Sequence, residues 1–241
     1  MATACLLVAA SLATTARAAD ADDLPAGKRV LFIGNSYTYY HAMPRLVSEL
    51  AELNGAPHPV VKTVTVGGAR LGDHWLNGDA QQAIDSAKWD VVVLQEASQQ
   101  PFIDDRSTRR YVASFADRIR RAGAQPAIYL TWARAYAPER QLSLNSFYRA
   151  LGLANNAMVV PVGPAWQIAM RMQAGLRLHD PDDSHPSLAG SCIAAYAFHA
   201  AIWQRPAETP HPACAEWHAI AVAAVAEAID QERLQAQALR R

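Results

Sequence analysis

The sequence predicts one α/β domain that is built on a doubly wound parallel sheet. Short apolar runs recur along the chain, a helical pattern follows each of them, and glycines or polar residues stand where several runs end. Apolar runs without polar alternation are typical of strands that are buried on both faces. Strands that alternate with helices favour a parallel sheet. No long linker or charge run separates these units, so we expect a single domain over residues 24–241.

Five strands and seven helices are expected in strict alternation until the last strand. The apolar runs that predict strands lie at residues 30–33, 90–94, 127–132 and 157–162, and the alternating segment 60–66 predicts a further strand. Helical spacing of apolar residues predicts helices at residues 43–53, 73–88, 104–122, 138–153, 165–174, 188–203 and 215–234. The clearest helix is 104–122, where Tyr111, Phe115 and Ile119 lie four residues apart and Gly123 ends the pattern. We therefore expect a five-stranded parallel sheet.

The composition limits the classes of partner. The chain has 241 residues, of which 51% are hydrophobic and 18% charged, and its formal net charge is zero. This length is enough for one well-buried core. A neutral chain without a basic stripe or a glycine-rich phosphate loop does not predict nucleic-acid binding. A small-molecule or carbohydrate substrate is expected instead, while the oligomeric state is not predicted.

Residues 1–18 read as a signal peptide. Residues 4–10 are apolar, and Ala16-Arg17-Ala18 matches a small-x-small cleavage site. About ten apolar residues are too few to span a bilayer, so no integral membrane span is expected. The first residues lack Lys and Arg, which leaves a late start or an alanine-rich tail as alternatives. The prediction is export to a periplasm or to the cell exterior.

Two cysteines remain once this leader is removed. Cys192 and Cys214 lie 22 residues apart, and an oxidising compartment permits a disulfide between them. Two ordinary buried thiols are the alternative, because sequence alone does not give their geometry.

Ser36 is the predicted nucleophile. The first apolar run ends at Gly34-Asn35-Ser36 and a helix follows, which places Ser36 on a turn at the carboxyl end of a strand. Open α/β sheets bind ligands at these ends. Asn and Ser are also common turn residues without any catalytic role.

A second stretch near the other end of the chain supplies a base and an acid. A serine hydroxyl needs a base within hydrogen-bond reach and a group that orients this base. His185 is the predicted base, and Asp182, three residues earlier, is the predicted acid. Asp180 and Asp183 are competing acids. The alternatives are an exposed acidic loop with an incidental His, or a metal-dependent site in the same loop. Only one His is present there, so no metal is predicted.

Acyl transfer also needs donors for the developing oxyanion. Three groups at predicted strand ends are candidates: the backbone N–H of Ser36, the backbone N–H of Gly68, and the side-chain amide of Gln95. A Ser, Gly or Gln at a strand end is, taken alone, more often a simple turn residue. The convergence of the three groups at one edge of the sheet is what favours an oxyanion hole.

The blocks around these residues resemble those of the SGNH or GDSL-like hydrolases, and most of the mature chain is similar. The first block reads Phe32-Ile33-Gly34-Asn35-Ser36-Tyr37-Thr38, with Gly-Asn-Ser in place of the more usual Gly-Asp-Ser. Gly68 falls on the second-block glycine, and Asp182 and His185 fall on the final Asp-x-x-His block. In the third block, Gln95 stands where the family has an Asn donor.

The resemblance implies a three-layer α/β/α flavodoxin-like fold and an esterase or lipase activity without a cofactor. We therefore expect a serine esterase that cleaves carboxylic esters, acyl or acetyl, through an acyl-Ser36 intermediate. An O-acetylated carbohydrate is the expected substrate class. The alternative is a flavodoxin-like binding module that holds a saccharide or a phospho-ligand without turnover.

Overall fold

The computed structural model describes residues 27–238 and confirms the predicted sheet. Five parallel strands lie in the order β2-β1-β3-β4-β5. Their bounds are β1 Arg29–Gly34, β2 Val60–Thr65, β3 Val91–Leu94, β4 Gln125–Tyr129 and β5 Met158–Val160. The order reverses at β1, where the chain runs first to β2 on one side and then to β3 on the other. Ligands of doubly wound sheets bind outside the carboxyl ends of the strands at such a switch point.

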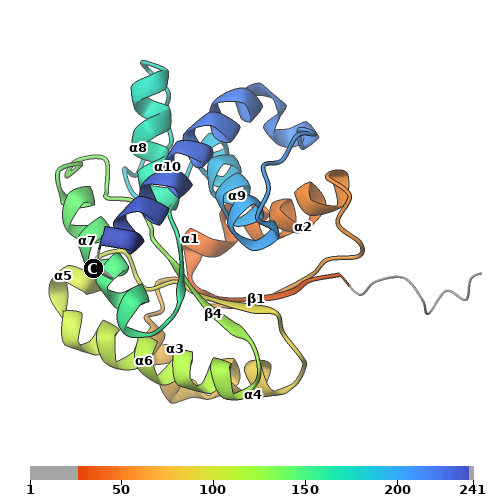
Figure 1. Ribbon diagram of the computed structural model, residues 1–241. Coiled ribbons are helices and arrows are strands. Elements are labelled where there is room, and N and C mark those ends of the chain that lie inside the picture. The colour runs from red at the N-terminus through yellow and green to blue at the C-terminus, as the bar shows by residue number, and fades with distance from the viewer. Residues whose placement is uncertain (1–26, 239–241) are drawn as a thin grey trace, which may run out of the picture.

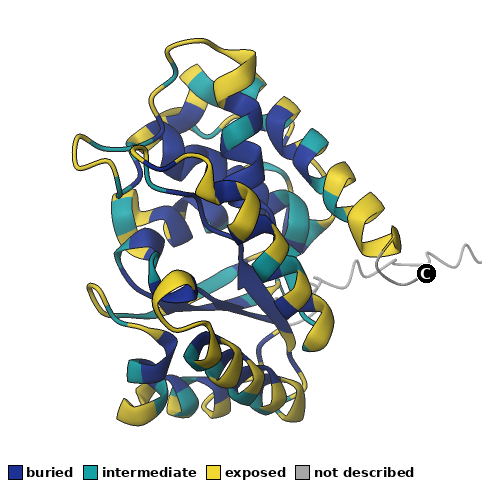
Figure 2. Ribbon diagram, turned by 90° about the vertical axis from the view of Figure 1, so that its left-hand side faces the viewer, coloured by how far each residue is buried: buried dark blue, intermediate teal, exposed yellow. Residues whose placement is uncertain are grey.

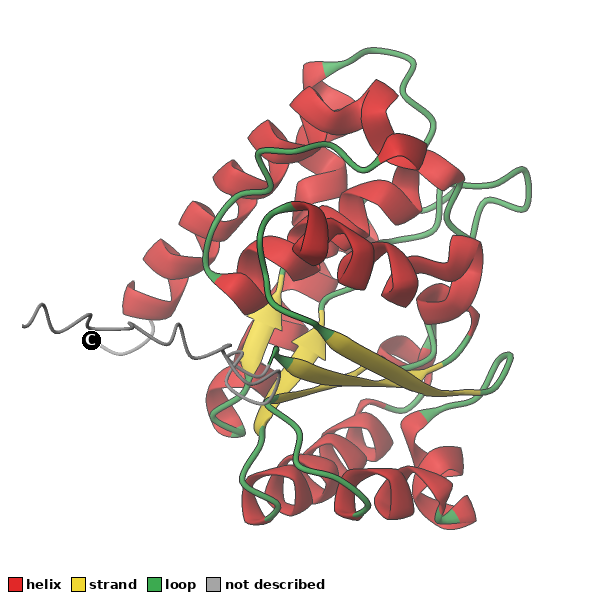
Figure 3. Cartoon of the chain, turned by 90° about the vertical axis from the view of Figure 1, so that its right-hand side faces the viewer, coloured by secondary structure: helices red, strands yellow, loops and turns green. Residues whose placement is uncertain are grey.

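Helices cover both faces of the sheet, as Figures 1 and 3 show. One layer contains α2 Met43–Leu53, α8 Val162–Met172, α9 Leu188–Trp203 and α10 His218–Ala238. The other contains α3 Leu71–Asn77, α4 Asp79–Asp85, α6 Asp105–Arg121 and α7 Arg140–Ala154. Short segments complete the path at α1 Ser36–Tyr39, η2 Tyr40–Ala42, α5 Gln100–Ile103 and η3 Pro212–Trp217.

The alternation of side chains along β1 explains the two cores. Val30 and Phe32 belong to the cluster beneath α2 and α9, whereas Leu31 and Ile33 belong to the cluster beneath α6. Successive side chains of a strand point to opposite faces. All four are fully buried because helices cover both of these faces. Figure 2 shows the buried sheet between the two helical layers. The continuous apolar run of the sequence is thus the signature of a strand that is covered on both sides.

Several predicted boundaries differ from the structure. The helix expected over residues 73–88 is two helices, α3 and α4, which Gly78 separates with a φ of 92°. The fourth strand ends at Tyr129, so Leu130, Thr131 and Trp132 belong to the loop at its carboxyl end. The last predicted helix starts as the 3₁₀ segment η3. The predicted signal peptide, residues 1–18, lies outside the described residues.

The C-terminal helix packs onto the domain. Among the described residues, Pro212–Ala238 is the one stretch whose length and composition would allow it to cross a membrane. Its apolar side is buried against α8 and α9. The buried residues of this helix, Ala221, Ala224, Val225 and Ala228, are mostly alanines.

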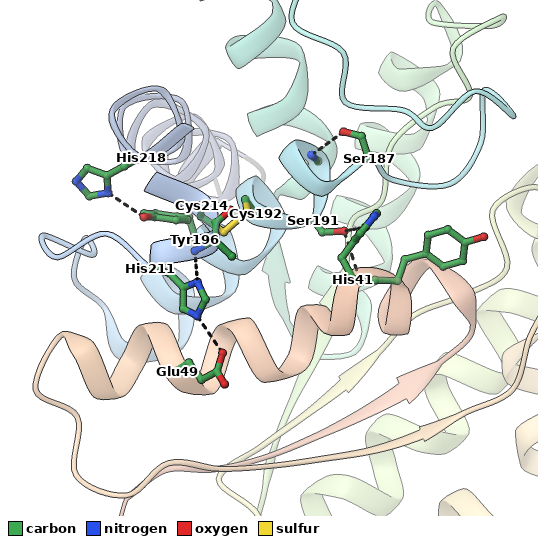
Figure 4. The surroundings of a disulfide bond; sticks show 12 residues. His41, Glu49, Ser187, Ser191, Cys192, Tyr196, His211, Cys214 and His218 are labelled. Atoms are coloured by element: carbon green, nitrogen blue, oxygen red, sulfur yellow. Dashed lines mark hydrogen bonds and ion pairs between the residues drawn. A yellow bond between two sulfur atoms is a disulfide. The ribbon is translucent and has the colours of Figure 1, made fainter. Parts of the chain in front are cut away.

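A disulfide joins Cys192 of α9 to Cys214 of η3, with 5.6 Å between their Cα atoms (Figure 4). Both residues are buried. The same region is held by a hydrogen bond of 2.9 Å between His211 and Glu49 of α2. The bridge therefore fixes the connection between α9 and α10 to the helical layer.

Removal of this disulfide should lower stability. Closing a loop of this length restricts the unfolded chain, and the loop-closure relation gives about 3 kcal/mol. We expect the paired variant Cys192→Ala, Cys214→Ala to lose about that much free energy of unfolding in urea titrations. The parent protein measured in reductant is the matched control and should show the same loss. An unchanged urea midpoint in both samples would contradict the assignment.

His199 is an unusual residue of the core. It lies in the middle of α9, fully buried, and neither ring nitrogen has a hydrogen-bond partner among the described residues. Its ring stacks on Trp203 at 5.6 Å. Burial lowers the pKa of His199 to about 4, and the charge of Arg205 acts in the same direction. The imidazole is thus held neutral in the folded state.

This burial predicts acid sensitivity. An unfolded His titrates near pH 6.5, so between pH 6.5 and about 4 the unfolded chain binds the extra proton and the folded chain does not. The free energy of unfolding should fall over this range by up to about 3 kcal/mol. His199→Leu should flatten this part of the profile, while His58→Gln, a substitution of an exposed His, should leave it unchanged. Parallel profiles for the parent and His199→Leu would refute this origin.

Candidate active site

Ser36 stands at the junction of β1 and α1. Asn35 caps the short helix, because its Oδ1 accepts a hydrogen bond from the backbone N–H of Tyr37 at 3.1 Å. The Asn35 side chain also donates to the carbonyl of Ala69 at 2.9 Å, which ties the turn to the loop after β2. Ser36 is the first residue of the helix and is half-buried, so its hydroxyl reaches the surface at the carboxyl edge of the sheet.

The predicted base and acid lie next to this hydroxyl. The Nε2 atom of His185 is 2.8 Å from Ser36 Oγ. The Nδ1 atom of His185 contacts Asp182 Oδ2, and Asp182 Oδ1 accepts the backbone N–H groups of Ser184 and His185 at 3.0 and 2.9 Å. Ser36 and His185 are 149 residues apart in sequence. The structure thus brings Ser36, His185 and Asp182 together in the order that a serine triad requires.

Hydrogen bonds select Asp182 among the three acids of the loop. The His185 hydrogen bond lowers the pKa of Asp182 to about 2, and the two backbone N–H groups act in the same direction. Asp182 is therefore ionised at any pH at which an esterase would be assayed. Asp183 has a φ of 58° and uses its carbonyl to accept the N–H of Ala135 at 2.9 Å. The Asp180 N–H donates to the carbonyl of His185 at 2.8 Å, so Asp180 closes the loop through its backbone.

The loop that carries His185 is anchored to the end of β4. The indole of Trp132 donates to the carbonyl of Ser184 at 2.9 Å, and the Nε2 atom of His179 lies 2.9 Å from the carbonyl of Ala133. The Ser184 hydroxyl also lies 2.8 Å from the hydroxyl of Tyr37, the residue after the nucleophile. These contacts fix the distance between the two halves of the site.

Aromatic rings hold the imidazole of His185. Tyr40 stacks on it at 4.3 Å with an interplanar angle of 12°, and Tyr37 meets it edge-on at 5.7 Å. Tyr40 owes its position to a strained turn, because His41 and Ala42 both have a φ of 50°. Non-glycine residues in this region cost free energy and persist only where their surroundings hold them. Here His41 is held by Ser191 of α9, with 3.1 Å between Nδ1 and Oγ (Figure 4).

Two backbone N–H groups are available for an oxyanion. Neither Ser36 nor Gly68 donates its N–H to another residue within the described part of the chain. Gly68 has a φ of 71°, a conformation that glycine adopts without cost, and it is exposed. Its loop is fixed on one side by Asn35 and on the other by Glu96, whose Oε1 accepts the N–H of Leu71 at 3.1 Å.

The structure corrects the prediction for Gln95. This residue is fully buried, and its Oε1 accepts the N–H of Asn35 at 2.8 Å and the hydroxyl of Thr38 at 2.9 Å. Its Nε2 donates to the carbonyl of Glu96 at 2.6 Å. The amide is therefore hydrogen-bonded beneath the nucleophile turn, Gly34-Asn35-Ser36, and does not face substrate. Its extra methylene, relative to Asn, lets the carboxamide reach that position.

The packing of Gln95 also explains Gly34. A Cβ at this position would lie 2.5 Å from Gln95 Oε1 and 2.7 Å from Thr38 Oγ1, so any larger residue would displace the amide. The carbonyl of Gly34 is bound by the imidazole of His74 at 2.8 Å. His74 and Gln95 thus support the turn from below, a role that no local sequence pattern indicated.

Glu96 is likewise a structural residue. It is 1% exposed, and burial raises the pKa of its carboxyl above the usual value, although the N–H groups of Ala97 and Leu71 lower it. Its Oε1 atom accepts both of these N–H groups. Glu96 therefore joins the loop after β3 to the loop that carries Gly68. In residues 27–238, no group of three or more His, Cys, Asp or Glu side chains is gathered as a metal site would need.

Comparisons with known proteins agree with this geometry. No protein-family model matches the sequence, and no curated protein matches it. Among solved structures, a candidate SGNH hydrolase from Slackia heliotrinireducens is 31% identical, has a TM-score of 0.63, and is aligned over 100% of its own chain and 73% of this one. The chain belongs to the SGNH hydrolases. This membership makes it an ester-bond hydrolase, and the α/β/α flavodoxin-like fold is confirmed.

Two further structures, each less than 25% identical in sequence, share the fold of this chain. A DUF4886 family protein from Bacteroides uniformis is 21% identical with a TM-score of 0.70, and the alignment covers 84% of this chain and 94% of that one. A variant of Axe2, an acetyl-xylooligosaccharide esterase from Geobacillus, is 16% identical with a TM-score of 0.60, and the alignment covers 76% of this chain and 98% of that one.

The stacking of Tyr40 predicts an effect on turnover. An aromatic pair of this geometry contributes about 0.5–1.5 kcal/mol, and here it fixes the plane of the base. We expect Tyr40→Ala to lower kcat about 3- to 10-fold with little change in KM, measured on p-nitrophenyl acetate. Tyr40→Phe keeps the ring and should retain the parent rate. Equal losses in both variants would show that the hydroxyl, and not the stack, is what matters.

Proposed function

We propose that this SGNH hydrolase cleaves carboxylic esters by double displacement through an acyl-Ser36 intermediate. The observation that carries the proposal is the 2.8 Å contact between Ser36 Oγ and His185 Nε2, with the ionised Asp182 behind the same ring. A hydroxyl becomes a competent nucleophile when a neutral imidazole can remove its proton. Asp182 fixes the Nδ1–H tautomer, which leaves Nε2 free to act as that base.

Acylation follows from these positions. Ser36 Oγ attacks the ester carbonyl carbon while its proton passes to His185 Nε2, and the carbonyl oxygen takes up the negative charge. When this intermediate collapses, the C–O bond to the alcohol breaks and His185 returns the proton to the departing oxygen. Acyl-Ser36 and a free alcohol result. Asp182 stays ionised throughout and stabilises the imidazolium form of His185.

Backbone donors serve the developing oxyanion. The N–H groups of Ser36 and Gly68 lie in adjacent loops, and the fixation of both loops through Asn35 supports their preorganisation. Donors that are already oriented need no rearrangement as the charge develops, which is why they stabilise the transition state. Gln95 contributes indirectly, because it holds the N–H of Asn35.

Deacylation uses the same residues in reverse. Water takes the place of the alcohol, His185 removes one of its protons, and the resulting attack releases a carboxylic acid and restores Ser36. No cofactor takes part in this sequence.

The surroundings of the triad favour an ester with a large alcohol portion. Ser36 and His185 are half-buried and Asp182 is exposed, so the triad lies in an open site at the surface. An open site accepts a bulky alcohol, and the fold is shared with an acetyl-xylooligosaccharide esterase. An O-acetylated carbohydrate is therefore the proposed substrate class. The leader-like residues 1–18 and the disulfide support export, since disulfides persist in oxidising compartments.

The test is covalent labelling of the nucleophile. Incubation with a fluorophosphonate followed by intact-mass spectrometry should show one adduct on the parent and none on Ser36→Ala. Asp182→Asn, which keeps the size of the side chain, should label about 10²- to 10⁴-fold more slowly, because the base loses its orientation.

The opposite result has a clear meaning. If the parent forms no adduct and hydrolyses none of a panel of acetyl esters, the catalytic proposal fails. A flavodoxin-like module that binds a saccharide or a phospho-ligand without turnover would then be the better account.

A further inference from the structure

Among the described residues, one arginine at the catalytic edge of the sheet has no acidic partner. Arg134 follows β4 in the loop that anchors the His185 segment, and its guanidinium donates to the hydroxyl of Tyr136 at 3.0 Å and of Ser98 at 3.4 Å. Among residues 27–238, no carboxylate oxygen lies within 4.0 Å of its nitrogens, Asp182 and Asp183 included. Its partners are neutral hydroxyls at the ends of β3 and β4.

The environment of Arg134 makes this lack of a counterion significant. The residue is half-buried, and its Nε is buried without any hydrogen-bond partner in the described structure. Burial lowers the pKa of Arg134, but the phenols of Tyr136 and Tyr37 outweigh it and leave the pKa above its ordinary value. The guanidinium is therefore charged, partly desolvated and not neutralised. By contrast, Arg149, another partly buried arginine, forms an ion pair with Glu232.

Arg134 lies on the side of the site that would hold the alcohol portion of an ester. The backbone on either side of it contacts the loop of the base, since the Ala133 carbonyl lies 2.9 Å from His179 Nε2 and the Ala135 N–H donates to Asp183. His185 gives its proton to the departing alcohol, so the alcohol portion of an ester lies on this side of Ser36. The oxyanion donors, Ser36 and Gly68, belong to β1 and β2 on the other side.

We infer that Arg134 binds a carboxylate on the alcohol portion of the substrate, so that the preferred substrates are acyl esters of acidic alcohols, such as acetylated sugar acids. This inference rests on the proposed esterase function. A planar guanidinium pairs with a carboxylate through two parallel hydrogen bonds, and this geometry gives specificity that a neutral hydroxyl does not. Tyr136, which is 63% exposed, places the end of this side chain at the surface, where a substrate can reach it.

The first experiment compares two esters of equal size. Acetoxybenzoate carries the anionic group and acetoxybenzamide replaces it with a neutral amide, and the 3- and 4-isomers of each sample two positions. We expect the parent to favour acetoxybenzoate in kcat/KM, chiefly through KM. Arg134→Gln loses one charge-assisted pair, so kcat/KM for acetoxybenzoate should fall about 10- to 100-fold. The value of kcat/KM for acetoxybenzamide should change less than about twofold.

Two further variants separate specificity from general effects. Arg134→Lys keeps the charge but not the planar fork, so an intermediate preference is expected. Arg121→Gln removes the same charge from the exposed end of α6 and should leave the preference of the parent intact. Added salt should weaken the preference in the parent and not in Arg134→Gln, because it screens an exposed ion pair.

Each contrary outcome has a defined meaning. Equal losses on both esters in Arg134→Gln would mark Arg134 as a structural residue, and the absence of any preference in the parent would overturn the inference; both would leave the esterase proposal standing. Failure of the parent to hydrolyse either ester, together with failure to label Ser36, would overturn the esterase proposal itself.

Discussion

The site depends on one hydrogen bond between segments from opposite ends of the chain. Ser36 and His185 meet at 2.8 Å because the turn after β1 and the loop before α9 are each held to the sheet and then to one another. A parallel sheet makes this possible, since all its strands end at the same edge. The Trp132 and His179 hydrogen bonds join the loop of His185 to the end of β4.

A second network stabilises the nucleophile turn from below. Gln95 and His74 bind the backbone of Asn35 and Gly34, and Asn35 in turn binds the loop of Gly68. Buried polar groups are stabilising when their partners are all present and costly when one is lost. The turn is thus held with the Ser36 hydroxyl outward and with the Ser36 N–H not bonded to any other described residue, which is the arrangement that acyl transfer needs.

Local patterns in the sequence were sufficient for the fold. Four apolar runs and one alternating segment predicted the five strands, and residues Ser36, Gly68, Asp182 and His185 were placed by their positions at strand ends and in one loop. The break between α3 and α4 was missed because an isolated glycine within a helical pattern does not by itself separate two helices. Boundaries of β4 and β5 depend on tertiary pairing, which periodicity does not contain.

The errors at the site have a different cause. Gln95 was expected to face the substrate because it follows a strand, yet its carboxamide lies beneath the Asn35 turn. Which way such a side chain points depends on what packs against it, here Gly34 and Thr38 from another strand and helix. No role was predicted for Tyr40 or Arg134 for the same reason. Tyr40 contacts His185 and Arg134 contacts Ser98, and both partners are distant in sequence.

The central claim is that Ser36 carries the acyl group, and rapid-quench mass spectrometry of the protein with p-nitrophenyl acetate tests it most directly. We predict a transient acetyl group on the peptide that contains Ser36, formed in step with a burst of p-nitrophenol. Turnover with no acyl group on the protein, or with one that maps to another residue, would contradict the account.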